Sequence, residues 1–161
     1  MASVKSKEGT PASSKAQDAT VLLKADHEKV SDLFIEYEEA RSTKEKKQIA
    51  EQICDELTVH ARIEEEIFYP AVKQALKDKE LIPEATVEHA TLKSLIDQVK
   101  GVEPDGEMFD ARIKVMHEYV KHHVKEEQNE IFPKAKSSGL DMMELGAKLS
   151  ERKEELRATM H

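Results

Sequence analysis

The chain has 161 residues, which is enough for one domain with a substantial buried core. Charged residues make up 36% of it and aromatic residues only 4%, a composition that favours helices over sheet. The net charge is -8, with acidic and basic residues interleaved along the chain, so we expect neither nucleic acid nor an anionic membrane as a partner.

Three features bear on the cellular location. The single cysteine, Cys54, excludes an internal disulfide framework and suits a reducing compartment. No apolar run approaches the roughly 20 residues that span a bilayer, and residues 1–16 lack the apolar segment of a secretory signal. We therefore expect a cytoplasmic protein that does not cross a membrane, with a disordered tail at residues 1–16.

Helical periodicity predicts four long helices and a shorter fifth one. In chain order they are expected at about 17–40, from just after Thr43 to about 78, from about Pro83 to Gly101, at about 107–136 and at 140–157. Asp18 or Thr20 is a candidate N-cap for the first helix. Four helices with short connections predict an all-α fold, an antiparallel up-down-up-down four-helix bundle over residues 17–136. Residues 137–161 are expected to form a C-terminal helical tail that packs on the outside or frays.

One motif, H-x3-E-x5-P, occurs twice, and the two copies define a repeat. A further histidine precedes each copy at almost the same distance, so the second half of the chain repeats the first at a nearly constant offset. Each proline lies inside a helical pattern, where it removes a backbone donor and should kink or end the helix. The repeated positions are His27 and His89, His60 and His123, Glu64 and Glu127, and Pro70 and Pro133.

The repeated histidines and glutamates fall on the stripes that 3/4 spacing assigns to the bundle core. In the second helix this stripe continues through Ile67 and Ala71. A buried carboxylate without a partner costs several kcal/mol, and no lysine or arginine shares the core phase of Glu64 or Glu127. A bound cation is the partner that the pattern indicates. Four imidazoles and two carboxylates suit two ions better than one, and mixed nitrogen and oxygen ligands suit iron or manganese and, less strictly, zinc.

The segments around the histidines resemble the four ligand motifs of hemerythrin-like (HHE cation-binding) domains. They read DHEKV, HARIEEEIFYP, EHATL and HHVKEEQNEIFP, and the resemblance covers roughly residues 18–136. It implies a bundle holding two non-haem iron ions with an oxo or hydroxo bridge. The implied metal ligands are His27, His60, His89 and His123, each on one ion, and Glu64 and Glu127 as bridges.

Two departures from the oxygen-carrying hemerythrins bear on function. Those proteins have a second histidine one turn after the third-helix ligand, where this chain has Lys93, and their fourth helix pairs histidine with aspartate across four intervening positions. Here three positions separate His123 from Glu127. Both features resemble the bacterial and regulatory HHE branch, and Lys93 leaves exchangeable positions on the metals. We therefore expect a di-iron protein that binds or reduces a small oxidant such as oxygen, peroxide or nitric oxide, with an enzymatic activity left open.

The alternative is an iron- or oxygen-responsive sensor, or an iron-handling protein, without turnover. Residues 140–161 or the N-terminal tail would then report to an unspecified protein partner. Several assignments stay open: Asp26, Glu65 and Glu88 lie one residue from expected ligands and could replace them, although helical phase disfavours this. His122 offers a second ligand register with Glu127. His117 and His122 are nevertheless expected at the solvated surface, and Tyr37 and Tyr69 as packing residues.

Overall fold

The computed structural model describes residues 17–160, and the tail expected at residues 1–16 lies outside the described part. Within residues 17–160 the chain forms helices and connecting turns, and no strand is present. The helices, in order, are α3 (Ala19–Glu39), α4 (Thr43–Ile63), η1 (Glu64–Phe68), α5 (Tyr69–Leu76), α6 (Leu81–Asp97), α7 (Glu107–Glu126), η2 (Glu127–Ile131), α8 (Phe132–Ser137) and α9 (Met142–Ala158).

Short polar side chains fix where several helices begin. Asp18 caps α3 by accepting the Thr20 N–H at 2.7 Å, and Ser42 caps α4 by accepting the Glu45 N–H at 3.1 Å. At α6 the side chain of Asp78 accepts the N–H groups of Leu81 and Ile82. The N-cap expected at Asp18 is therefore the one found.

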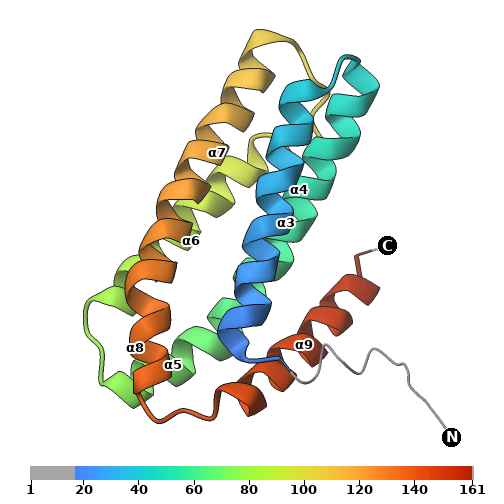
Figure 1. The fold of residues 1–161 in the computed structure, drawn as a ribbon. Helices are drawn as coiled ribbons and strands as arrows, with labels where there is room; N and C mark the ends of the chain where they lie inside the picture. The colour runs from blue at the N-terminus through green and yellow to red at the C-terminus, as the bar shows by residue number, and fades with distance from the viewer. Residues whose placement is uncertain (1–16, 161) are drawn as a thin grey trace, which may run out of the picture.

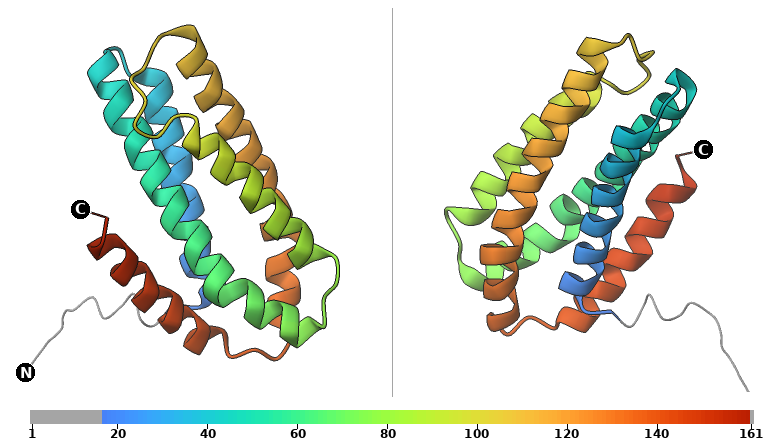
Figure 2. Two further views of the ribbon diagram at one scale, coloured as in Figure 1. Left: turned by 180° about the vertical axis from the view of Figure 1, so that it is seen from behind. Right: turned by 45° about the horizontal axis from the view of Figure 1, so that its top comes forward.

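The long helices run alternately up and down beside one another (Figures 1 and 2). The path rises through α3, descends through α4 and α5, rises through α6 and descends through α7 and α8. This confirms the predicted all-α, antiparallel four-helix bundle. α9 is the extra C-terminal helix, and it packs outside the bundle against α3 and α4. No helix within residues 17–160 combines the length and the apolar character needed to cross a bilayer.

Neither Pro70 nor Pro133 ends its helix, but the regular α-helical hydrogen bonding is interrupted just before each. Immediately before each proline the chain winds through one π-helical turn, η1 or η2, and then resumes α-helix. The Tyr69 N–H bonds the Glu64 carbonyl oxygen, and the Phe132 N–H bonds that of Glu127. Because proline supplies no N–H and its ring crowds the preceding turn, the wider winding accommodates it. Each π-turn begins at one of the repeated glutamates.

The π-turn after Glu64 also shifts which residues face the core. A turn closed by i to i−5 bonds holds one residue more than an α-turn, so the buried face moves along by one position. After Glu64 the fully buried side chains are those of Phe68 and Val72, whereas Ile67 and Ala71 are only partly buried. In the second helix the expected stripe is therefore correct up to Glu64 and one residue out of phase beyond it, whereas in the fourth helix Ile131, four residues after Glu127, is buried.

The apolar core forms two clusters with a polar layer between them. The upper core cluster includes Phe34, Ile53 and Phe109. The lower core cluster includes Leu23, Phe68 and Phe132, together with Leu145 and Leu149 from α9. The buried histidines and glutamates lie between the two clusters in every helix of the bundle, so apolar side chains close the layer at both ends.

Candidate metal centre

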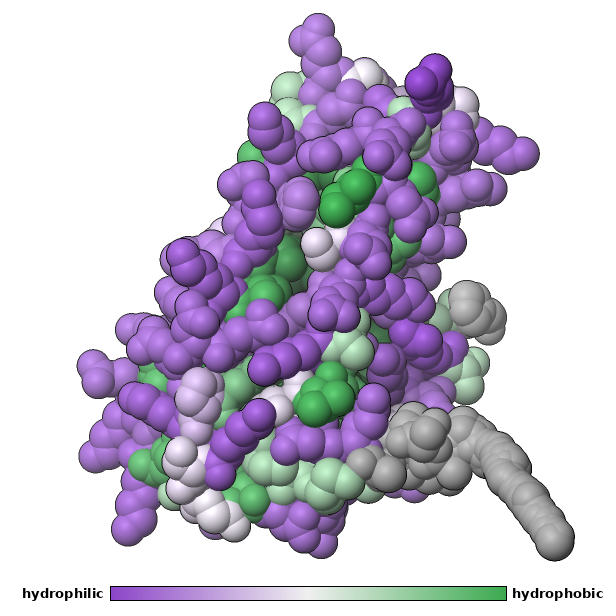
Figure 3. Space-filling model, in the orientation of Figure 1, coloured by the Kyte–Doolittle hydropathy of each residue, from purple (hydrophilic) through white to green (hydrophobic). Residues whose placement is uncertain are grey.

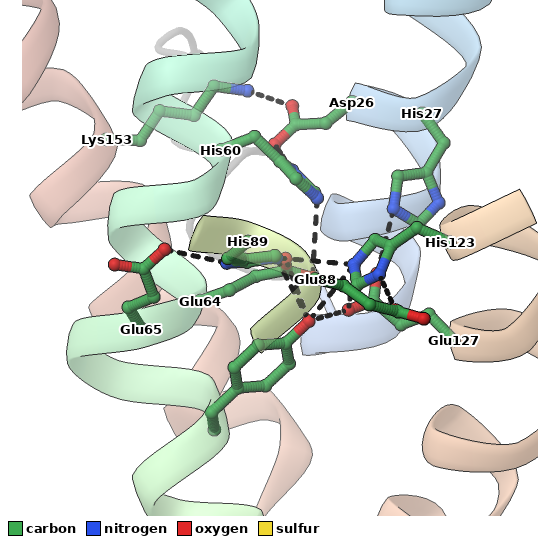
Figure 4. Close-up of polar contacts among 11 residues, drawn as sticks. Asp26, His27, His60, Glu64, Glu65, Glu88, His89, His123, Glu127 and Lys153 are labelled. Atoms are coloured by element: carbon green, nitrogen blue, oxygen red, sulfur yellow. Dashed lines mark hydrogen bonds and ion pairs between the residues drawn. The ribbon is translucent and has the colours of Figure 1, made fainter. Parts of the chain in front are cut away.

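The structure brings all six expected ligand residues into one buried cluster (Figure 4). The side chains of Glu64 and Glu127 are completely buried, and that of His27 is only 7% exposed. The other three histidines are also buried. Each helix of the bundle contributes, so the cluster depends on the assembled fold. The contributors are His27 from α3, His60 from α4, Glu64 from η1, His89 from α6, His123 from α7 and Glu127 from η2.

Potential ligand atoms gather in two overlapping groups. The first joins His27, His60, Glu64 and Glu127, and the second joins Glu64, His89 and His123; within each group the ligand atoms lie within 4.8 Å of one another. Glu64 belongs to both groups. The two groups are therefore neighbours that share one carboxylate.

Each glutamate meets one imidazole from either half of the repeat. Glu64 lies 3.3 Å from His60 Nε2 and 3.1 Å from His89 Nε2. Glu127 lies 3.0 Å from His27 Nε2 and 3.7 Å from His123 Nε2. All four Nε2 atoms consequently face the same carboxylate-lined space.

In three of the four imidazoles, the Nδ1 atom, which points away from the centre, meets a carboxylate. Asp26 Oδ2 lies 2.9 Å from His60 Nδ1, Glu65 Oε2 lies 2.7 Å from His89 Nδ1, and Glu88 Oε1 lies 2.6 Å from His123 Nδ1. A carboxylate that accepts the Nδ1–H leaves the Nε2 lone pair directed at the centre and increases its basicity.

From the sequence, Asp26, Glu65 and Glu88 were possible replacements for the expected metal ligands. In the structure they orient the histidines instead. None of the three belongs to either central group; each supports a histidine on a neighbouring helix instead. A signal for two of them was present, because Asp26 and Glu88 also correspond in the repeat, each directly before a repeated histidine.

The fourth imidazole breaks this pattern. His27 Nδ1 is buried without a hydrogen-bond partner among the described residues. In the repeat, the counterpart of Glu65 is Gln128, directly after Glu127, and its side chain is not charged. His27 instead stacks on Phe132, with ring centroids 5.9 Å apart and planes at 3°.

The charges of the centre favour a cation. Burial disfavours an imidazolium, but Glu64 and Asp26 more than offset that cost and raise the pKa of His60 well above its usual value. For His89 burial has the same effect, yet hydrogen bonds to Glu64 and Glu65 raise its pKa to about 9. Burial opposes ionisation of Glu127 too, but His123 and His27 hold its pKa well below the usual range. The buried carboxylates therefore stabilise positive charge in the centre, whether it is carried by protonated imidazole or by a bound cation.

The unpaired atoms fit metal ions. His60 Nε2 and Glu64 Oε2 are buried and face the centre; they lie 3.3 Å from each other, and neither makes a hydrogen bond within the described chain. Buried polar atoms of this kind are rare without a partner. An imidazole nitrogen and a carboxylate oxygen are ordinary ligands of iron, manganese and zinc.

Tyr69 places a hydroxyl group inside the second group of ligands. Its oxygen lies 3.3 Å from Glu64 Oε1, His89 Nε2 and His123 Nε2, and it also donates to Glu127 Oε2. Burial and the charges of Glu64 and Glu127 raise the pKa of Tyr69 well above its usual value, so the phenol is neutral and can donate a proton. The sequence indicated only a packing role for Tyr69 and missed this contact.

A second residue missed from the sequence is Lys153, on α9. Its ammonium group forms an ion pair with the buried carboxylate of Asp26 (Figure 4). Burial disfavours the charged form of Asp26, but His60 and Lys153 more than compensate and lower its pKa to about 2. Lys153 lies outside the repeat, so periodicity gave no signal for it.

The remaining sequence candidates lie outside the centre. His122 is 63% exposed and pairs with Glu126 at 3.1 Å, so the alternative register through His122 is wrong. His117 is only partly exposed, because its ring stacks on Phe34 with centroids 4.4 Å apart, so it is less solvated than expected. Lys93 is exposed and belongs to neither group of ligand atoms.

A small apolar cavity adjoins the centre. Its volume is about 20 Å³, enough for about one water molecule or a diatomic molecule. A groove of about 250 Å³ between α3 and α7 also reaches His27 and shares Val120 and Val124 with the cavity. In Figure 3 apolar side chains show through the polar surface between these helices. The basic side chains of Lys121 and Lys125 line this groove.

Residues 18–135 match the hemerythrin HHE cation binding domain family. The chain therefore belongs to this family, and it is a hemerythrin-like metal-binding domain with a His/Glu cluster in the core of its helical bundle.

Two similar proteins give further context. The chain is 30% identical over 111 residues to a DNA nickase of Nostoc sp. (strain PCC 7120 / SAG 25.82 / UTEX 2576). The match covers 69% of this chain but spans only 31% of that protein. In fold it is similar to the crystal structure of a hemerythrin HHE cation binding domain-containing protein of Mycobacterium kansasii, an Rv2633c homolog. The TM-score is 0.77, with 24% identity and 89% of each chain covered.

Proposed function

We propose that this chain is a non-haem di-iron protein that binds or reduces a small oxidant: oxygen, peroxide or nitric oxide. The observation that carries the proposal is the pair of overlapping His/Glu groups that share Glu64. Four imidazoles and two carboxylates supply ligands for two ions without saturating them. The cavity of about 20 Å³ beside them admits only a very small ligand.

The residues around the centre suit reduction of such a ligand. Conversion of one hydrogen peroxide to two waters takes two protons and two electrons, and two ferrous ions held by these residues would supply the two electrons. The neutral hydroxyl of Tyr69 is placed to pass on one of these protons, because it already donates to Glu127. Manganese could serve the same ligands, and zinc could bind them without redox chemistry.

Iron loading without air tests the proposal. Metal-free protein and a His60→Ala variant are incubated with ferrous iron, freed of excess metal and analysed for iron per chain. We expect two irons per chain in the parent and fewer in the variant, and visible absorption typical of oxo-bridged ferric pairs once air is admitted. A colourless product, or equal iron content in the two proteins, contradicts the proposal.

A second candidate is an iron- or oxygen-responsive sensor without turnover. The observation that favours it is the contact of α9 with Asp26, because this contact connects a peripheral helix to the histidine layer. Steady-state peroxide consumption separates the two functions: turnover well above that of an equal amount of free iron excludes a purely sensory role.

A further inference from the structure

α9 brings three cationic side chains to carboxylates of the bundle. Arg152 Nε lies 2.7 Å from Glu66 Oε1, Arg157 pairs with Glu56 at 2.6 Å, and Lys153 pairs with Asp26. Of these contacts only the last leads directly to an expected metal ligand.

The contacts of Asp26 form a continuous link from α9 to the centre. Its Oδ1 atom meets Lys153 Nζ at 2.5 Å, and its Oδ2 atom meets His60 Nδ1 at 2.9 Å. Asp26 is only 4% exposed. With Lys153 on one oxygen and His60 on the other, its carboxylate is fixed in one orientation, and it fixes the His60 ring in turn.

The other half of the repeat lacks this support. Glu88 corresponds to Asp26 and holds His123 in the same way, at 2.6 Å. Within the described chain no lysine or arginine pairs with Glu88; its additional neighbour is the exposed His122, at 4.0 Å. α9 therefore gives the Asp26 side of the centre an ionic support that the Glu88 side lacks.

We infer that Lys153 is a positioning residue for the metal centre: through Asp26 it orients His60, and it makes cation binding at one of the two positions depend on the docking of α9. That position is the group of His27, His60, Glu64 and Glu127. The inference rests on the proposed two-metal site. The effect of Lys153 is confined to this position, because His123 Nδ1 meets Glu88, and Glu88 has no contact with α9 among the described residues.

Zinc titration of metal-free protein tests this selectivity, since zinc is diamagnetic and redox-inactive. Binding is followed by calorimetry and by NMR of ¹⁵N-labelled histidines, so that His60 and His123 are observed separately. In a Lys153→Met variant we expect zinc to bind about tenfold more weakly at the His60 position. Affinity at the His123 position stays unchanged, and Lys153→Arg restores the parent behaviour.

Matched variants separate positioning from general stability. Lys148 is an exposed lysine of the same helix, and its ionic partner is Glu144, also on α9. Lys148→Met should leave the zinc affinity of both positions unchanged. Glu88→Gln should weaken only the His123 position. If Lys153→Met does not fold, Asp26→Asn interrupts the same link.

Two results overturn the inference while leaving the two-metal site intact. One is unchanged zinc binding in a Lys153→Met protein of lower thermal stability, which would reveal a purely structural ion pair. The other is equal weakening at both positions. A parent protein that binds no zinc or a single ion contradicts the proposed site itself, and the inference fails with it.

Discussion

Tyr69 and Phe132 occupy equivalent places in the two halves, each directly before the repeated proline, and differ by one hydroxyl group. The Tyr69 hydroxyl lies among Glu64, His89 and His123, whereas the Phe132 ring stacks on His27. One side of the centre thus has a proton donor, and the other has an apolar wall. The duplicated sequence therefore builds a chemically asymmetric site.

Removal of this hydroxyl should affect chemistry more than metal binding. A Tyr69→Phe variant keeps all six expected ligands, so we expect its iron content to equal that of the parent. Loss of a positioned acid should slow peroxide reduction by about a hundredfold. Single-turnover kinetics of the ferrous protein with peroxide measures this effect.

Tyr37→Phe is the control for the tyrosine experiment. The Tyr37 hydroxyl donates to Asp110 at 2.7 Å, away from the centre. If the two variants react at the same rate, Tyr69 is not the proton donor.

The sequence predicts those residues of the centre that recur in both halves of the chain, and no others. His27 and Glu64, for example, recur in both halves on core-phased positions, and the structure brings them together. Asp26 also has a counterpart, but its role depends on how α3 faces α4, which spacing along one helix does not specify. Lys153 recurs nowhere, and it meets Asp26 from the opposite end of the chain. Only the packed fold reveals such a contact.

At the scale of the helices, the π-turns are what an α-helical period could not predict. Pro70 and Pro133 predict a break in the regular i to i−4 hydrogen bonding. In the structure this break takes the form of one wider, π-helical turn before each proline. The extra residue carries Phe68 into the core where Ile67 was expected. The spacing of apolar residues predicts the buried face of a helix only where the number of residues per turn is constant, and a π-turn changes that number.

Docking of α9 depends on the absence of a side chain at Gly146. A Cβ added there would overlap the carbonyl oxygen of Gln17, just before α3. We expect Gly146→Ala to lower the free energy of unfolding by about 1–3 kcal/mol, because the helix must move away from α3. Chemical denaturation measures the change.

A substitution on the exposed face of α9 provides the comparison. Lys148→Ala should alter stability by no more than about 0.5 kcal/mol. Equal stability of the Gly146→Ala protein and the parent would show that the close approach at this glycine is unimportant.

At the scale of the whole molecule, the stability of the metal-free protein should depend on pH differently from that of the metal-loaded protein. In the metal-free protein the folded-state pKa values of His60, His89 and His123 are raised. A raised pKa contributes stability that is complete below the unfolded value, near 6.5, and is lost as pH rises through the folded value. For His89 that loss extends to about pH 9.

Denaturation between about pH 6 and about pH 9.5 is the measurement. We expect the metal-free protein to lose stability across this range, because its imidazolium groups lose the protons that balance Glu64 and Glu127. Zinc binds deprotonated imidazole, so its affinity increases with pH and the loaded protein should not show this loss. Parallel pH profiles for the two forms would contradict this account of the charges.

The family match ends at residue 135, before α9 begins at Met142. A recombinant fragment trimmed to that boundary would retain every histidine and glutamate of the cluster, but Asp26 would lose its ammonium partner. Apolar side chains such as Leu22 and Leu23, which share a cluster with Leu145 and Leu149, would be left uncovered. The segment that matches the family is therefore shorter than the segment that supplies the contacts of Asp26 and covers this end of the core.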